Sequence, residues 1–256
     1  MNSENLFSRR LRAKLASTAD VVVFTGAGMS AESGVPTFRG ENGLWKKFRP
    51  EELANFDAFI RNPDLVWEWY MHRKRLISDI QPHPGHFAVA EMEKIFEKVT
   101  VVTQNIDNLH RRAGSTRIHE LHGNITRNYC ISCGAVYPNE LLPSSPGAPR
   151  CTKCNGLIRP DVVWFGELLP AEEWDASIAA AERADLFLAV GTSAVVYPAA
   201  SIPQVAQRAG AFVVEINIER TDLSFKADEF IQGKAGEILP ELVKLAAALK
   251  KDHQEI

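Results

Sequence analysis

An apolar run that ends at a pair of glycines constrains the fold more than any other feature of this chain. Residues 20–34 read DVVVFTGAGMSAESG, and the β-branched residues before Gly26 predict a buried strand. The glycines predict a tight turn, and residues 30–33 are typical of the opening of a helix. A strand that passes through a glycine turn into a helix is a building unit of α/β sheets.

The same turn has a possible ligand. Gly26, Gly28 and Ala31 match the dinucleotide fingerprint G-x-G-x-x-G/A, and the start of the helix would attract a phosphate, although an ordinary strand-to-helix turn has the same pattern. A Rossmann dehydrogenase places a second strand next and an acidic ribose ligand about 20 residues on. Glu51 and Glu52 lie at that distance, but in a helical pattern. A dinucleotide site here therefore needs a different way of binding the ribose.

Further strands are predicted at residues 99–103, 118–121, 158–164, 186–190 and 212–216. Helical patterns are found at residues 6–19, 51–61, 65–80, 86–96, 109–113, 171–183, 202–208 and 236–250. Strands that alternate with helices predict an α/β fold with a doubly wound parallel sheet, in which ligands bind at the strand ends. Residues 158–164 are expected to return the chain to this main sheet. Residues 195–198 are expected to be extended and edge-like, because proline disfavours a central strand.

Composition limits the function classes. The 256-residue chain is 45% hydrophobic, which allows one sizeable core or a core with a small satellite module. Its formal net charge of -3 gives no basic footprint for nucleic acid or an anionic membrane. The polar start lacks the apolar segment of a secretory signal, and no apolar run approaches the roughly 18 residues of a membrane span. We expect a cytoplasmic monomer without nucleic-acid or membrane partners.

The four cysteines form two close pairs, Cys130 with Cys133 and Cys151 with Cys154, separated by 17 residues. This spacing is typical of two tight knuckles that place four sulfur ligands around one zinc ion. Because cysteine fills all four positions and leaves none for water, the zinc is expected to be structural. The stretch between the pairs is poor in apolar residues, so metal binding would provide its folding energy. The alternative is a zinc ribbon that binds nucleic acid. This alternative is disfavoured because the cysteine segment lies inside an α/β chain.

Polar side chains follow two of the predicted strands. Gln104, Asn105 and Asp107 come directly after residues 99–103, where α/β sheets place ligand contacts; alternatively, Asn105 and Asp107 cap the next helix. His122 follows residues 118–121 and precedes Gly123, so the backbone can expose its imidazole. A histidine with a pKa near neutrality suits a general base, whereas a lone histidine is more often structural.

Six motifs, taken in order, resemble those of sirtuins, the NAD-dependent protein lysine deacylases. They are GAGMSAESGVPTFR at residues 26–39, TQNID at 103–107, HG at 122–123, the four cysteines, GTS at 191–193 and IN at 216–217. The resemblance covers about residues 20–235. It implies a Rossmann-like fold that binds NAD in an inverted manner, with a flexible cofactor loop at residues 34–45.

The resemblance also implies a domain organisation. Residues 1–126 and 159–256 would form the Rossmann-like domain, with a helical and cofactor-loop insertion at about residues 40–96. Residues 127–158 would form the inserted zinc-binding module. The expected fold class is therefore α/β, a Rossmann-like doubly wound parallel sheet with a small zinc-ribbon module and a helical module.

Carried over by position, the resemblance implies which residues bind NAD as a co-substrate. Gln104 would contact the ribose, whereas Asn105, Ile106 and Asp107 would form the nicotinamide pocket. The adenosine half would be held by Ser193, Asn217 and Ala235. The full set of expected cofactor-binding residues is Gly26, Ala27, Gly28, Glu32, Thr37, Phe38, Arg39, Trp45, Gln104, Asn105, Ile106, Asp107, Gly191, Thr192, Ser193, Asn217, Ile218, Glu219 and Ala235.

For the protein substrate, the resemblance implies a backbone that inserts as an added strand between two edges. The residues of these edges are Val162, Trp164, Phe165, Gly166, Val195 and Tyr197. Tyr70 and Arg73 share a face of the predicted helix at residues 65–80. They match the pair that a deacylase subclass uses to bind acidic acyl groups, in which arginine pairs with a carboxylate. Alternatively, they belong to a solvated face, since His72, Lys74 and Arg75 surround them.

The implied reaction removes acetyl, and also succinyl and malonyl, groups from lysine side chains. The nicotinamide bond of NAD breaks, His122 acts as general base through the ribose hydroxyls, and the acyl group moves to ADP-ribose. The products are nicotinamide and O-acyl-ADP-ribose, and no hydride moves. The missing strand and acid after the glycine turn disfavour a dehydrogenase, and the acidic charge balance disfavours a nucleic-acid-binding zinc module.

Overall fold

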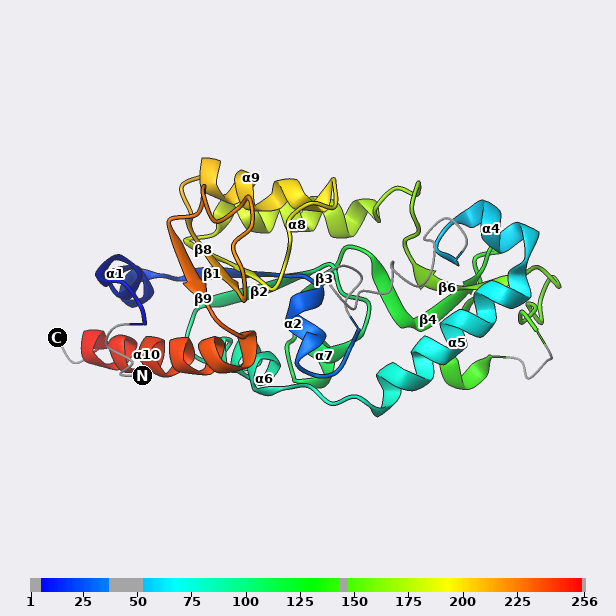
Figure 1. The fold of residues 1–256 in the computed structure, drawn as a ribbon, viewed down its shortest axis with the longest axis horizontal. Helices are drawn as coiled ribbons and strands as arrows, with labels where there is room; N and C mark the ends of the chain where they lie inside the picture. Colours follow the sequence, from blue (N-terminus) through cyan, green and yellow to red (C-terminus); the bar gives the residue numbers. More distant parts are fainter. Residues whose placement is uncertain (1–5, 37–52, 143–146, 255–256) are drawn as a thin grey trace.

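A parallel sheet of six strands forms the centre of the larger part of the molecule in the computed structural model, which describes residues 6–36, 53–142 and 147–254 (Figure 1). The strand order is β3-β2-β1-β7-β8-β9. The strands are β1 Asp20–Thr25, β2 Lys98–Thr103, β3 Ile118–Glu120, β7 Leu186–Val190, β8 Phe212–Asn217 and β9 Glu229–Gln232. The predicted α/β class with a parallel sheet is confirmed.

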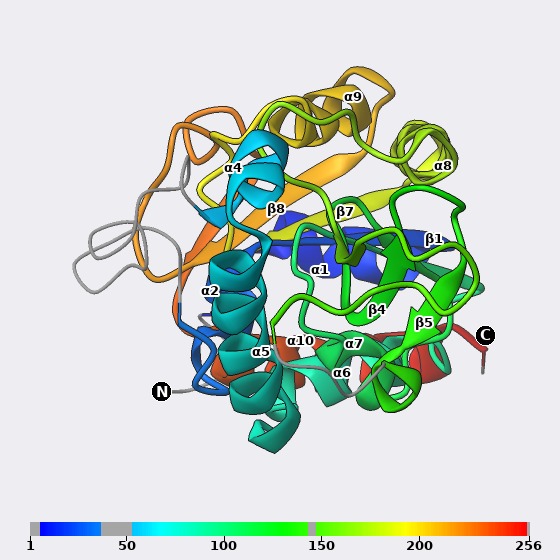
Figure 2. The same cartoon turned by 90° about the vertical axis from the view of Figure 1, so that its right-hand side faces the viewer.

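Helices cover both faces of this sheet (Figures 1 and 2). They are α1 Arg9–Ser17, α6 Pro84–Met92 and α10 Ala235–Gln254 on one face, and α8 Ala171–Arg183 and α9 Ile202–Arg208 on the other. Val21 and Val23 of β1 pack in the first layer, whereas Val22 and Phe24 pack in the second. Because successive side chains of a strand point to opposite faces, a strand covered on both faces needs a continuous apolar run.

A smaller antiparallel sheet of order β5-β4-β6 lies at the other end of the molecule (Figures 1 and 2). Its strands are β4 Gly123–Cys130, β5 Val136–Pro138 and β6 Ile158–Val162, and it packs with α4 Phe56–Arg61 and α5 Pro63–Asp79. Trp67 of α5 donates from Nε1 to the oxygen of Ile158 at 2.7 Å. Lys74, about two turns further along α5 and buried, donates from Nζ to Asn128 and Asn139 side-chain oxygens, each at 2.9 Å.

Two details of the sequence-based prediction are wrong. Residues 158–164 do not return to the main sheet, because β6 pairs with β4 and Ile158 lies opposite Cys130. Cys130 ends β4 and the second cysteine pair precedes β6, whose residues Ile-Arg-Pro-Asp-Val lack the continuous apolar run of a strand covered on both faces. Residues 195–198 form a bend and a turn before η4 Ala199–Ser201 and do not form an extended edge. The proposed domain bounds stay a prediction.

Other elements differ little from their predicted ranges. The helices at residues 171–183 and 202–208 and the strand at residues 186–190 have the predicted bounds. Three short elements complete the described chain: α2 Ala27–Ala31, α7 Leu109–Arg112 and η3 Asn139–Leu141. Strands β4 and β5 of the small sheet and β9, which pairs with β8, were not predicted. Within the described residues, no helix combines the length and the apolar character that crossing a membrane requires.

Candidate active site

The carboxyl ends of four neighbouring strands meet at one edge of the main sheet. Gly26 follows β1, Gln104 follows β2, Gly191 follows β7, and Asn217 ends β8. These strands are parallel and adjacent in the order β2-β1-β7-β8, so the residues after them come together. Four motifs that are far apart in the sequence thus share one edge, which is where α/β sheets bind ligands.

The turn after β1 packs directly against the turn after β7. Gly28 donates from its backbone N to the oxygen of Gly191 at 2.8 Å, and Gly26 donates to the oxygen of Val190 at 3.1 Å. A Cβ atom on Gly28 would lie 2.8 Å from the oxygen of Gly191. One on Gly191, whose φ is +57°, would lie 2.2 Å from the backbone N of Met29. Both positions therefore require glycine, and the two turns meet backbone to backbone.

Two amide side chains tie strand ends to Thr192. Gln104 donates from Nε2 to Thr192 Oγ1 at 3.0 Å, and Asn217 donates from Nδ2 to Thr192 O at 3.0 Å. Gln104 follows β2 and Asn217 ends β8, so Thr192 is held from both sides of β7. These two bonds hold the polar side chains of Gln104 and Asn217 in place at the strand ends.

Asn105 and Asp107 have different roles in the structure. Asn105 donates from Nδ2 to the oxygen of Gly26 at 2.8 Å and to Ser30 Oγ at 3.1 Å, so its amide faces the glycine turn. Asp107 accepts from the backbone N of Leu109 at 2.9 Å, a local bond just before α7, whose N-cap residue is Asn108. Burial raises the pKa of Asp107, and its hydrogen bonds with Leu109 and Ser30 oppose that shift. The carboxyl group, at 4% exposure, therefore holds its proton more readily than an exposed aspartate does.

A buried chain of hydrogen-bonding groups behind Asn105 was not predicted. His110 Nε2 lies 3.1 Å from Thr25 Oγ1, which donates to Thr103 Oγ1 at 2.8 Å. Thr103 Oγ1 in turn accepts from the backbone N of Asn105 at 3.0 Å. Burial lowers the pKa of His110 to about 3, so this imidazole is neutral. His110 and Thr25 are 85 residues apart, and nothing in the sequence links them.

His122 lies where the chain passes from β3 of the main sheet to β4 of the small sheet. Its Nδ1 lies 2.9 Å from the oxygen of Gln104, and its own backbone oxygen accepts from Val163 N at 3.0 Å. Gly123 has a φ of +77°, and a Cβ there would lie 2.2 Å from Asp161 O, so the turn after His122 requires glycine. Burial lowers the pKa of His122, with the hydrogen bond to Gln104 opposing the shift.

Other residues expected to bind NAD lie around the same edge. Glu32 accepts through Oε1 from the backbone N of Gly236 at 2.9 Å, which joins the end of α2 to the start of α10, beside the buried Ala235. Ser193, Ile218 and Glu219 are exposed. Four further expected cofactor contacts fall outside the described residues, namely Thr37, Phe38, Arg39 and Trp45.

The residues predicted to form the peptide-binding edges differ in exposure. Phe165 is 47%, Val195 41% and Tyr197 69% exposed, as expected of side chains that meet a partner. Val162 and Trp164 are buried, at 8% and 2%. Gly166, which follows Phe165, has a φ of +88° and so uses the conformational freedom of glycine. The Trp164 side chain points into the core of the small part rather than to the surface.

Tyr70 and Arg73 are buried side by side on α5, at 1% and 8% exposure, so the solvated-face alternative is wrong for both. Trp164 donates from Nε1 to Tyr70 Oη at 2.7 Å. The guanidinium carbon of Arg73 lies 4.7 Å from the ring centroid of Trp69, within the range of a cation–π contact. Burial raises the pKa of Tyr70 and lowers that of Arg73, and the opposing charge of each group partly offsets the shift of the other.

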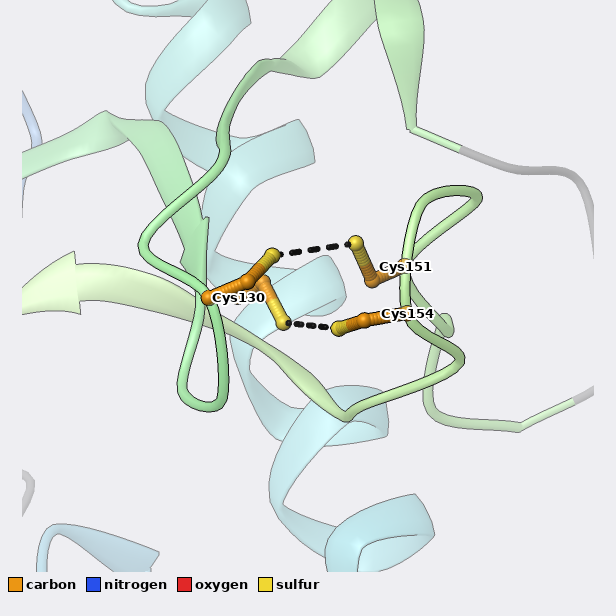
Figure 3. Close-up of side chains that lie close together, drawn as sticks. Cys130, Cys151 and Cys154 are labelled. Atoms are coloured by element: carbon orange, nitrogen blue, oxygen red, sulfur yellow. Dashed lines mark hydrogen bonds between the residues drawn. The ribbon is translucent and has the colours of Figure 1, made fainter.

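The four cysteines form a compact cluster between two loops of the small part, and their sulfur atoms lie within 4.8 Å of one another. Cys130 Sγ lies 3.5 Å from Cys154 Sγ, and Cys133 Sγ lies 3.6 Å from Cys151 Sγ (Figure 3). Sulfur ligands about 2.3 Å from zinc lie about 3.8 Å apart at the corners of a tetrahedron, so the cluster is suited to a structural zinc ion. Tyr137 Oη lies 3.2 Å from Cys151 Sγ, where it can orient that ligand.

Comparison with known proteins agrees with this arrangement. The Sir2 family model matches residues 26–198, more than half of the chain. The chain is 56% identical over 234 residues to NAD-dependent protein deacylase 2 of Pyrobaculum aerophilum, covering 90% of this chain and 92% of that protein. It is similar to the crystal structure of a Sir2 homolog–NAD complex, with a TM-score of 0.88 and 45% identity over 95% of each chain.

A second solved structure is a Sir2 protein with a deacetylated p53 peptide and 3'-O-acetyl ADP-ribose. Its TM-score is 0.83 at 34% identity, covering 92% of this chain and 97% of that one. The matched family model begins at the glycine turn and includes His122 and all four cysteines. On these grounds, the chain belongs to the Sir2 family, the sirtuins.

Proposed function

We propose that this chain is an NAD-dependent protein lysine deacylase, which transfers an acyl group from a lysine side chain to ADP-ribose and releases nicotinamide. Family membership and the relative named a deacylase support this function. The observation that carries it is the setting of His122. Its imidazole contacts the oxygen of Gln104 at the strand ends, and its backbone oxygen contacts Val163 in the predicted peptide-binding segment. One residue therefore borders both the expected NAD site and the expected substrate site.

The hydrogen bond of His122 assigns its proton. A carbonyl oxygen can only accept, so Nδ1 carries the proton that it donates to Gln104 O at 2.9 Å. Nε2 is then the basic nitrogen, and burial, which lowers the pKa, keeps the imidazole neutral at pH 7. NAD supplies the activated ribose that receives the acyl group. We infer that Nε2 of His122 removes a proton from a ribose hydroxyl as the acyl group is transferred.

The residues at the strand ends would orient the dinucleotide. Gly26 and Gly28 would allow the phosphates to approach the backbone, and Asn105 and Asp107 would form part of the nicotinamide pocket. The substrate would be an acylated lysine of a protein, whose backbone adds a strand beside Phe165 and Gly166. The peptide in the related solved structure supports a protein or peptide substrate.

We further propose that the acyl pocket accepts succinyl and malonyl groups in addition to acetyl. Arg73 is a buried cation on α5, three residues from Tyr70. A carboxylate at the end of the acyl chain would form charge-assisted hydrogen bonds with its guanidinium, and the Tyr70 hydroxyl would add a further hydrogen bond. An acetyl group has no such carboxylate. Arg73 therefore favours acidic acyl groups without being required for deacetylation.

The test is to compare succinyl-lysine and acetyl-lysine peptides with the Arg73→Met variant in the presence of NAD. We expect kcat/KM for the succinyl peptide to fall by about 10- to 100-fold relative to the acetyl peptide, the size of a lost hydrogen bond to a charged group. Arg75→Met is the matched control, because Arg75 lies on the same helix and is exposed.

The outcomes separate two levels of the proposal. Succinyl turnover that survives undiminished in Arg73→Met would contradict the acid-pocket assignment and leave the deacylase activity intact. Turnover of neither peptide by the unmodified chain with NAD would contradict the deacylase activity itself.

A further inference from the structure

The hydroxyl of Tyr70 is held from behind by a tryptophan. Trp164 Nε1 donates to Tyr70 Oη at 2.7 Å, and the two ring centroids lie 6.2 Å apart. Both side chains are nearly inaccessible, at 1% exposure for Tyr70 and 2% for Trp164. An indole N–H can only donate, so Tyr70 uses an oxygen lone pair in this bond. The Tyr70 O–H remains available to donate in another direction.

Trp164 is in turn fixed by an ion pair. The guanidinium carbon of Arg159 lies 3.5 Å from the ring centroid of Trp164, a close cation–π contact. Glu167 Oε2 accepts both from the backbone N of Trp164 at 2.8 Å and from Arg159 Nη2 at 2.9 Å. Arg159 Nη1 donates to Glu167 Oε1, which makes the pair bidentate. One carboxylate therefore holds both the backbone and the stacking partner of Trp164.

Stability alone does not account for this ion pair. The Arg159 side chain is only 3% exposed, and its Nε is a buried donor without a hydrogen-bond partner among the described residues. Removing a charge from water is costly, and a buried ion pair contributes little net stability compared with apolar residues of similar size. Arg159 lies closest to the ring of Trp164, at 3.5 Å against 5.5 Å for Tyr129 and 6.0 Å for Phe56. We therefore ask what the position of the Trp164 ring determines.

We propose that Trp164, held by Arg159 and Glu167, is a positioning residue that aims the Tyr70 hydroxyl at acidic acyl groups. This inference rests on the proposed acyl preference and extends it. Arg73 supplies the charge that attracts an acyl carboxylate, and Trp164 sets the direction in which Tyr70 donates. The selectivity of the pocket then depends on residues of β6 and the turn after it, in addition to α5.

The test uses a pair of matched tryptophan variants. Trp164→Phe keeps an aromatic ring and removes the N–H that binds Tyr70. Trp67→Phe makes the same change at another buried tryptophan, whose Nε1 donates at 2.7 Å to the oxygen of Ile158 and not to Tyr70. We measure kcat/KM for succinyl- and acetyl-lysine peptides. The succinyl-to-acetyl ratio is expected to fall by about 3- to 10-fold in Trp164→Phe and to stay within about twofold in Trp67→Phe.

A double-mutant cycle with Tyr70→Phe isolates the coupling. If Trp164 acts through the Tyr70 hydroxyl, adding Trp164→Phe to Tyr70→Phe leaves the ratio unchanged. Additive effects of the two substitutions would overturn the proposal, and so would equal ratios in Trp164→Phe and Trp67→Phe. Those two outcomes would overturn the role of Trp164 alone. If the unmodified chain deacetylates but does not desuccinylate, both the proposed acyl preference and the role of Trp164 are wrong.

Discussion

At the scale of single residues, the position of one proton on His122 decides how the proposed chemistry depends on pH. The ring donates from Nδ1 to Gln104 O, so Nε2 must be unprotonated to act as a base. Burial is the main cause that lowers the pKa of His122 from its ordinary value of 6.5. The neutral, active form therefore persists to a lower pH than it would for an exposed histidine.

We expect the acidic limb of kcat/KM for deacetylation to lie below pH 6.5, because this profile reports the pKa of the base in the form of the enzyme that the peptide binds. The measurement is a pH–rate profile with an acetyl-lysine peptide at saturating NAD. His122→Ala should lower kcat/KM by about 10²- to 10⁴-fold and abolish this limb. His72→Ala, an exposed histidine on α5, is the control. A limb at or above pH 6.5, or full activity of His122→Ala, would contradict the assignment.

Residue identity and spacing predicted the sites of some of these side chains but not the long-range contacts of others. The cysteines were predicted because zinc geometry requires a fixed local spacing, and His122 because a glycine follows it. The contact between Trp164 and Tyr70 spans 94 residues of sequence and depends on the rotamers of both rings. Likewise, His110 could not be linked to Asn105, because their connection runs through two buried threonines on neighbouring strands.

At the scale of secondary-structure elements, the candidate NAD site depends on how closely the turns after β1 and β7 approach. A methyl group on Gly28 would lie 2.8 Å from the oxygen of Gly191, and that backbone atom cannot move aside alone. Gly28→Ala would therefore force the two turns apart. We expect it to weaken NAD binding by at least about 10-fold and to lower the free energy of unfolding by about 1–3 kcal/mol, as overpacking does.

Gly114→Ala separates loss of stability from loss of binding. Gly114 has a φ of +105°, but a Cβ there would come only within 3.8 Å of the Ala90 side chain. We expect about 1–3 kcal/mol of destabilisation from backbone strain and an NAD Kd within about twofold of the unmodified chain. Calorimetric titration with NAD and chemical denaturation measure the two quantities. Equal NAD affinity in Gly28→Ala and Gly114→Ala would contradict the claim that NAD binding requires the close contact between Gly28 and Gly191.

The order of strands could be predicted only in part. The apolar runs that form β1, β2, β7 and β8 indicated a parallel sheet, because strands covered on both faces leave a clear pattern. β6 reads Ile-Arg-Pro-Asp-Val and lacks the continuous apolar run of those strands, and it joins β4 with Ile158 opposite Cys130. β9 reads Glu-Phe-Ile-Gln at one edge of the sheet, and so short an edge strand has little pattern to recognise.

At the scale of the whole molecule, the candidate site lies where the two parts of the chain meet. The main sheet supplies the glycine turns and amide side chains, and the small part supplies α5, β6 and the turn after β6. His122 occupies the crossing between β3 and β4. This division suits a reaction with two substrates, because each part can hold one of them and the imidazole lies between.

The most direct test of the central claim is mass spectrometry of NAD incubated with the chain and an acetyl-lysine peptide. We predict that NAD is consumed only when the acylated peptide is present. Free nicotinamide, deacylated peptide and O-acetyl-ADP-ribose should then form in equal amounts. Reduction of NAD to NADH with the nicotinamide still attached, or release of free acetate without acetyl-ADP-ribose, would contradict the account.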